Sequence, residues 1–227
     1  MKKFVTPIVI HKNLNLSIWK NDQLRPEVRK ALLRIAKEFY KFLKVSVPIQ
    51  DIVIYGSQAN YNFTPNSDLD LHLIFNYNSI KCDEPIEALF DTKRKLWKEK
   101  HSIEIYGIPV ELYAEDLHVK PVSSSYSVLR NTWIKHPSVN SIQWNKKKVK
   151  SLVMFWQQII DLSVKTENYQ IAEKLLSVLV KFRKVGLKQN GEFGIENLTF
   201  KSLRNSGDIE KLNNFINKIK DQDLSLD

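Results

Sequence analysis

The sequence predicts an α/β (α+β) protein in which a small mixed sheet is covered by helices and followed by a helical region. Two observations predict this architecture. In the first half of the chain, short β-prone runs alternate with helical patterns. From residue 146 to residue 220, apolar residues recur at helical spacing almost throughout. We therefore expect two domains, residues 1–120 and residues 121–227.

The first expected elements are a helix and two strands. Apolar residues line one helical face over residues 26–44, and Pro26 suits a first helical turn. Residues 51–55 are β-prone and stop at Gly56, after which a short helix is expected. Alternating residues predict a second strand at 69–75.

A second helix and a hairpin complete the expected sheet region. Residues 85–100 have an apolar helical side, with Asp83 as the expected cap. Residues 101–106 and 108–113 are both β-prone, and Gly107 between them suits a tight turn. These elements give the mixed sheet its remaining strands.

Four helices are expected in the second region. Apolar residues mark one helix around 152–160 and a longer one that ends at Gly186 or Gly191. Two shorter helices should follow, with Gly207 just past one and Asp208 capping the next.

Composition narrows the class of protein. Cys82 is the only cysteine, so an intrachain disulfide is excluded and an intracellular, cytoplasmic setting is expected. No apolar stretch approaches the roughly 20 residues that span a bilayer, so no membrane association is expected. Lys and Arg outnumber Asp and Glu by 35 to 25, and this excess favours phosphate-bearing partners.

An Asp-x-Asp pair carries the strongest chemical signal. Because side chains alternate along a strand, Asp68 and Asp70 should project to one face, while Leu69 and Leu71 pack on the other. Two carboxylates this close repel unless a cation lies between them, and oxygen ligands favour Mg²⁺ or Mn²⁺. The pair therefore predicts half of a metal site.

A Gly-Ser pair stands a short distance before these acids. Gly56 permits close backbone approach, and Ser57 is expected at a helix N-terminus, where amide groups attract phosphate. Phosphate beside a metal is the arrangement that phosphoryl transfer needs.

The strand, Gly-Ser and the two acids together resemble the nucleotidyltransferases of the DNA polymerase β superfamily, with Gly56, Ser57, Asp68 and Asp70 at the motif positions. The resemblance implies a core at residues 1–120, Mg²⁺ or Mn²⁺ as cofactor and an NTP as substrate. It also implies a third carboxylate, for which Glu111 is the best match, with Glu104 as the rival and Glu115 further away.

Other segments resemble uncharacterised nucleotidyltransferases of large tailed phages, which would place the protein in the host cytoplasm. These segments begin at Leu14 and Gly191. Many relatives carry a small or basic residue where this chain has Gln58. Further candidates for nucleotide contact are Asn60, Ser67, Tyr126 and Arg130.

The expected reaction moves a nucleoside monophosphate from an NTP to a hydroxyl, with an RNA 3′ end as the preferred acceptor. Alternatives are nucleotidylation of a protein and synthesis of a second-messenger nucleotide. A catalytically silent nucleic-acid-binding module and a metal-dependent glycosyltransferase are rivals of other classes.

His72 shares the face of Asp70, and a structural hydrogen-bonding role is favoured for it.

Overall fold

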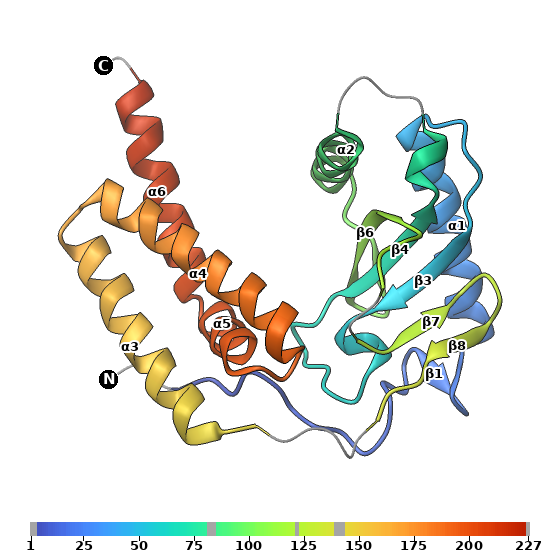
Figure 1. The fold of residues 1–227 in the computed structure, drawn as a ribbon, viewed down its shortest axis with the longest axis horizontal. Coiled ribbons are helices and arrows are strands. Elements are labelled where there is room, and N and C mark those ends of the chain that lie inside the picture. The colour runs from blue at the N-terminus through green and yellow to red at the C-terminus, as the bar shows by residue number, and fades with distance from the viewer. Residues whose placement is uncertain (1–3, 81–84, 121–122, 139–143, 226–227) are drawn as a thin grey trace. The chain divides into compact units, whose positions relative to one another are not determined.

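The computed structural model forms two compact units, Val9–Asn140 and Met1–Ile8 with Ser141–Asp227. We call them the sheet unit and the helical unit (Figure 1). The structure describes residues 4–80, 85–120, 123–138 and 144–225. The expected cap Asp83 lies outside these ranges.

The sheet unit contains a mixed sheet of six strands in the order β5-β6-β4-β3-β7-β8. The strands are β3 (Asp51–Tyr55), β4 (Leu69–Phe75), β5 (Glu104–Ile105), β6 (Ile108–Asp116), β7 (Ser125–Ser127) and β8 (Thr132–Lys135). Only β4 and β6 pair in parallel; the other neighbours in this sheet are antiparallel. A separate hairpin joins β1 (Trp19–Lys20) to β2 (Gln23–Leu24). The expected α+β class is confirmed.

Two helices pack against this sheet, one against β4 and the other against β6. They are α1 (Pro26–Leu43) and α2 (Ile86–Lys100). Trp97 of α2 packs edge-on against Phe39 and Phe42 of α1, with ring centroids 5.4 and 5.3 Å apart. In β4, Leu69 and Leu71 are buried, as the alternating pattern predicted. The opposite face of β4 is therefore left for polar side chains.

Two single 3₁₀ turns connect these elements. They are η1 (Ser57–Ala59), which follows β3, and η2 (Tyr77–Ser79), which follows β4. The short helix expected after Gly56 is thus one turn only, so its helix dipole is small.

The helical unit contains α3 (Lys146–Lys165), α4 (Tyr169–Asn190), α5 (Ile195–Asn205) and α6 (Asp208–Leu224). Helix α4 runs through Gly186 and ends at Gly191, so of the two expected stops Gly191 is correct. A Cβ at Gly186 would lie 2.3 Å from the Cβ of Glu196, which shows that this glycine permits close helix packing. Gly207, with φ of 78°, is the N-cap of α6, and Asp208 is its first residue rather than its cap.

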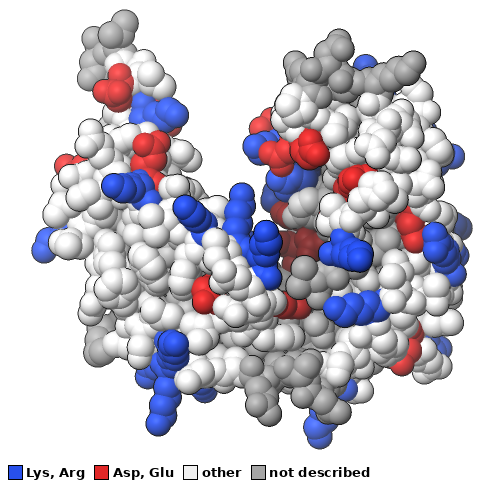
Figure 2. Space-filling view, viewed as in Figure 1, with Lys and Arg blue, Asp and Glu red and all other residues white. Residues whose placement is uncertain are grey.

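Lys and Arg side chains lie on both units (Figure 2). The net charge of +10 is therefore not confined to one unit. No helix within the described ranges is long and apolar enough to cross a membrane.

Candidate active site

The predicted acids come together where β4 and β6 run side by side. Parallel pairing places Asp70 directly beside Glu111. Because neighbouring strands lie about 4.8 Å apart and paired residues face the same way, the two carboxylates are neighbours on one face. Asp68 lies immediately before β4, and it lines a cavity together with Glu111. The fold thus brings three acids into one region.

The register also distinguishes the three candidates for the third carboxylate. Glu104 is on β5 and pairs with Pro109 of β6. Strand β5 lies two strands from β4. Glu115 pairs with Ile74, four residues further along β6 than Glu111. Only Glu111 is adjacent to Asp70 in this pairing. The register favours Glu111, whose metal role stays a prediction.

Gly56 follows β3 and lies against the carboxylate of Asp70. Its φ of 75° and ψ of −158° suit glycine and are rarely adopted by other residues. A Cβ at this position would lie 2.4 Å from Oδ2 of Asp70. The glycine therefore allows the carboxylate to lie against the backbone at the end of β3.

Side-chain hydrogen bonds hold the loop between Gly56 and β4. Gln58 is buried, and its Nε2 donates to the carbonyl oxygen of Ser67 at 3.0 Å. The hydroxyl of Ser67 accepts from the amide of Thr64 at 2.9 Å. Oδ1 of Asn60 accepts from the next amide along the chain at 2.8 Å. Gln58 thus has a structural role, while nucleotide contacts by Asn60 and Ser67 stay predictions.

Glu111 is held by two donors. The ammonium group of Lys98 contacts its carboxylate, and the hydroxyl of Tyr113 donates to Oε2 at 2.7 Å. Burial raises the pKa of Glu111, but the hydrogen bonds from Lys98 and Tyr113 outweigh it, so the net pKa is lowered. Burial, followed by the charge of Asp70, raises the pKa of Tyr113. The tyrosine therefore stays a neutral donor.

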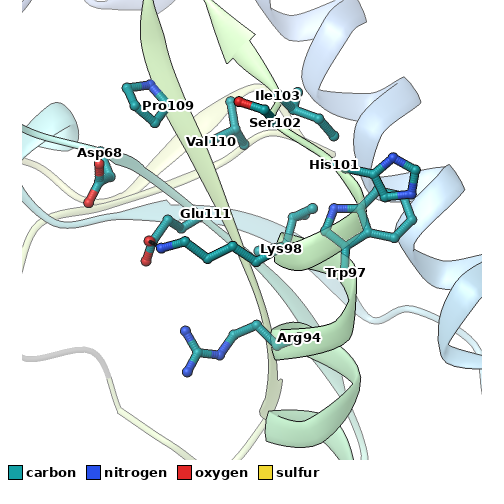
Figure 3. A pocket seen from close by; sticks show the side chains of 11 residues that line it. Asp68, Arg94, Trp97, Lys98, His101, Ser102, Ile103, Pro109, Val110 and Glu111 are labelled. Carbon is teal, nitrogen blue, oxygen red and sulfur yellow. Dashed lines mark hydrogen bonds and ion pairs between the residues drawn. The ribbon is translucent and has the colours of Figure 1, made fainter. Parts of the chain in front are cut away.

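A cavity of about 330 Å³ opens beside these acids (Figure 3). Asp68 and Glu111 lie at one end of it, and Lys98 reaches toward them from α2. Trp97 and His101 form its other end, with ring centroids 4.1 Å apart. A space of this size holds one small ligand.

Comparison with protein families gave a match that lies within the sheet unit. The family model described as nucleotidyltransferase domain matches residues 32–136. The matched segment lies wholly inside the sheet unit and includes the acids, Gly56 and all six strands of the main sheet. No curated protein and no solved structure gave a match.

The donor chemistry of the three acids fits a hard cation. Asp68, Asp70 and Glu111 offer carboxylate oxygens, the ligands that Mg²⁺ and Mn²⁺ prefer. The ammonium group of Lys98 already holds a positive charge against Glu111. Among the described residues, no group of three or more His, Cys, Asp or Glu side chains is arranged to hold a metal. A shift of Lys98 and of these carboxylates would thus accompany metal binding.

His72 lies deeper on the face that carries Asp70. Its ring lies between those of Tyr55 and Tyr113, with centroids 4.4 and 4.5 Å away. Nδ1 of His72 lies 3.1 Å from Oε2 of Glu115. These contacts support the structural role expected for the histidine.

Tyr126 and Arg130 lie at the β7 side of the sheet unit. Tyr126 is fully buried and packs edge-on against Trp19, with ring centroids 4.9 Å apart. Nε of Arg130 lies 3.6 Å from Oδ2 of the buried Asp51. Both residues thus have structural contacts, and their proposed nucleotide contacts stay predictions.

Sequence analysis missed Lys98, Arg94 and Tyr113 as neighbours of Glu111. The guanidinium carbon of Arg94 lies 4.9 Å from the ring centre of Tyr113. The i, i+4 spacing of Arg94 and Lys98 places them on one side of the predicted helix, and Tyr113 alternates with Glu111 along the strand. Those two patterns were the available signals, but neither says that the helix packs beside this strand.

Proposed function

We propose that the chain transfers a nucleoside monophosphate from an NTP to a hydroxyl acceptor, with Mg²⁺ or Mn²⁺ bound by Asp68, Asp70 and Glu111. The observation that carries the proposal is the pairing of Asp70 with Glu111 above Gly56, inside the matched nucleotidyltransferase domain. The presence of all three acids in this region argues against a catalytically silent binding module.

In the proposed reaction, the acceptor oxygen attacks the α-phosphorus of the NTP. A new oxygen–phosphorus bond forms, and the bond from the α-phosphorus to the bridging oxygen of the β-phosphate breaks. Pyrophosphate leaves with the electrons of the broken bond, and the hydroxyl proton passes to water. The bound metal ions supply positive charge against the triphosphate.

The backbone at Gly56 and Ser57 would bind the terminal phosphates of the NTP. Support comes from the place of Gly56, at the end of β3 and against the carboxylate of Asp70. A phosphate bound at this turn would lie beside the proposed metal ligands. Asp68 and Asp70 would hold both metal ions, and Glu111 would help to orient the metal ion of the attacking hydroxyl.

For the acceptor we propose RNA, at a 3′ end. The net charge of +10, with Lys and Arg on both units, suits a long polyanion better than a protein hydroxyl. We also propose that residues 1–120 are the catalytic core and that residues 121–227 help to bind nucleotide or acceptor. Nucleotidylation of a protein and synthesis of a second-messenger nucleotide are the alternatives.

The test is transfer of label from each α-labelled NTP to host RNA, host protein and free nucleotides, at low and moderate salt. We expect label in RNA, with transfer falling as salt rises because phosphate contacts release counterions. Label only in protein would replace the RNA proposal with protein nucleotidylation. Label in none of the three fractions would contradict the transferase.

The third carboxylate is tested in the same assay. Glu111→Gln should lower transfer by about a hundredfold or more, since it removes a charge beside Asp70. Glu104→Gln, a matched change two strands from β4, should leave most activity. The opposite ranking would assign the third ligand to Glu104.

A further inference from the structure

The cavity beside Glu111 lies on one side of the acids, and the proposed phosphate turn lies on the other. In the sheet order β5-β6-β4-β3, Gly56 follows β3 on one side of β4. Glu111 and the cavity belong to β6 on the other side. Neither Gly56 nor Ser57 lines the cavity. The donor phosphates and the cavity therefore flank Asp70 from opposite sides.

A transfer reaction requires this separation of its two substrates. The attacking oxygen and the leaving oxygen lie roughly in line on opposite sides of the α-phosphorus. If the leaving pyrophosphate lies toward Gly56, the attacking hydroxyl must come from the β6 side. The cavity is on that side, and Asp68 and Glu111 both line it.

The chemistry of the cavity wall changes along its length (Figure 3). Next to the acids, α2 contributes two cations, Lys98, which contacts Glu111, and Arg94, which lies 2.7 Å from Asp91. Both line the cavity, and such side chains bind phosphate. Further along, the exposed ring of His101, which lies against the buried Trp97, suits a base. The wall thus offers carboxylates for a ribose hydroxyl, cations for a phosphate and a ring for a base, the three groups that a nucleotide carries on its sugar.

We propose that this cavity binds the nucleotide that carries the acceptor hydroxyl. The inference rests on the proposed transferase function, and it adds the place and the chemical class of the second substrate. The hydroxyl lies at Asp68 and Glu111, the phosphate contacts Lys98 and Arg94, and the base packs against His101. A volume of about 330 Å³ matches one nucleotide and leaves no room for a folded protein segment.

Two variants test the cavity without touching the acids. Ser102 and His101 both line it and are exposed, so Ser102→Trp and His101→Ala should leave the fold intact. Ser102→Trp fills the cavity, and His101→Ala removes a ring. Ser79→Trp and His118→Ala are the matched controls, at exposed positions that do not line it.

The measurement is fluorescence anisotropy of a 5′-labelled tetraribonucleotide with a free 3′ hydroxyl. Stacking of a base on a ring is worth about fivefold to a hundredfold in affinity, so His101→Ala should weaken binding by about fivefold or more. Ser102→Trp should weaken it further. Affinity for α,β-methylene-ATP, the donor probe, should stay the same in both variants and both controls.

Competition by AMP separates the two sources of the acceptor nucleotide. If AMP displaces the tetraribonucleotide, a free nucleotide is sufficient to occupy the cavity. If AMP does not displace it, the cavity requires the end of an RNA chain. Wild type that does not bind the donor probe would contradict the transferase function. The nucleotide site would still stand if affinity for the tetraribonucleotide depends on His101. The inference is overturned if wild type binds neither AMP nor the tetraribonucleotide, if both variants bind them as wild type does, or if the variants weaken only the donor probe.

Discussion

The two units place their polar side chains differently. In the helical unit, the buried carboxylate of Asp208 accepts hydrogen bonds from Gln157 at 2.7 Å and Ser206 at 2.5 Å. In the sheet unit, Asp70 lies beside a second acid, Glu111. Asp208 is buried with neutral donors around it, whereas Glu111 takes its donors, Lys98 and Tyr113, beside a cavity. Asp208 thus stabilises the fold, and we propose that the acid pair binds a ligand.

The largest expected effect comes from the acids of the sheet unit. Asp70→Asn or Asp68→Asn should lower NTP turnover by about a thousandfold, since each removes a proposed metal ligand. The free energy of unfolding should stay close to that of wild type, because asparagine keeps the size and shape of the aspartate side chain. Turnover assays and thermal unfolding measure the two effects.

Asp22→Asn is the control for those variants, because Asp22 is exposed and does not line the acid-bearing cavity. It should leave both turnover and unfolding as in wild type. Full turnover in Asp70→Asn, with an unchanged melting temperature, would show that the acid pair serves no metal.

A smaller loss is expected when the carboxylate is moved instead of removed. Gly56→Ala places a Cβ 2.4 Å from Oδ2 of Asp70, so the carboxylate must shift and turnover should fall by about a hundredfold. Gly107→Ala is the matched control, since its φ is 76° but no atom lies within 4 Å of the added Cβ. Both variants have backbone strain of about 1 kcal/mol. Equal turnover in the two would show that the position of Asp70 is unimportant.

In the helical unit the expected effect is on stability. Asp208→Ala leaves Gln157 without the acceptor of its buried hydrogen bond, so unfolding should become easier by about 2–3 kcal/mol. Chemical denaturation measures this loss, and Asp221→Ala, at an exposed position in α6, is the control. Turnover per folded molecule should not change. A stable but inactive Asp208→Ala protein would remove the contrast between the units.

The sequence predicted the local elements well, because their signals are local. The helix expected at residues 26–44 is observed as Pro26–Leu43, and the strand expected at 69–75 is observed as Leu69–Phe75. Proline at a first turn, alternation of apolar residues and glycine at strand ends act within a few residues. Such features can be read without the rest of the fold.

Elements that depend on distant partners were missed. Strands β7 and β8 were not predicted, because β7 is only Ser-Tyr-Ser and gains its place by pairing with β3. For the same reason, the cations of α2 were not assigned to the site, since only tertiary packing brings Lys98 to Glu111. The Asp-x-Asp pair and Gly56 were found because the residues that form this motif lie close together in the sequence.

The smallest effect expected is a pH dependence in the helical unit. Lys201 is 15% exposed and lies 3.4 Å from Glu192. Burial lowers the pKa of Lys201 below its ordinary 10.5, against the raising effect of Glu192. Between the lowered value and 10.5, the unfolded chain binds this proton more than the folded protein does. The contribution of Lys201 to stability therefore rises as pH rises through this interval.

Lys201→Met, which keeps the apolar length of the side chain, should remove that rise. The melting temperature of wild type relative to Lys201→Met should increase by about one or two degrees from neutral pH toward 10.5. Lys218→Met, at an exposed position in α6, controls for the loss of one positive charge. A relative melting temperature that falls with pH would mean that Glu192, rather than burial, dominates the pKa of Lys201. Lys201 and Glu192 would then stabilise the helical unit as an ion pair. That result would sharpen the contrast between the helical unit, which pairs opposite charges, and the sheet unit, which places Asp70 beside Glu111.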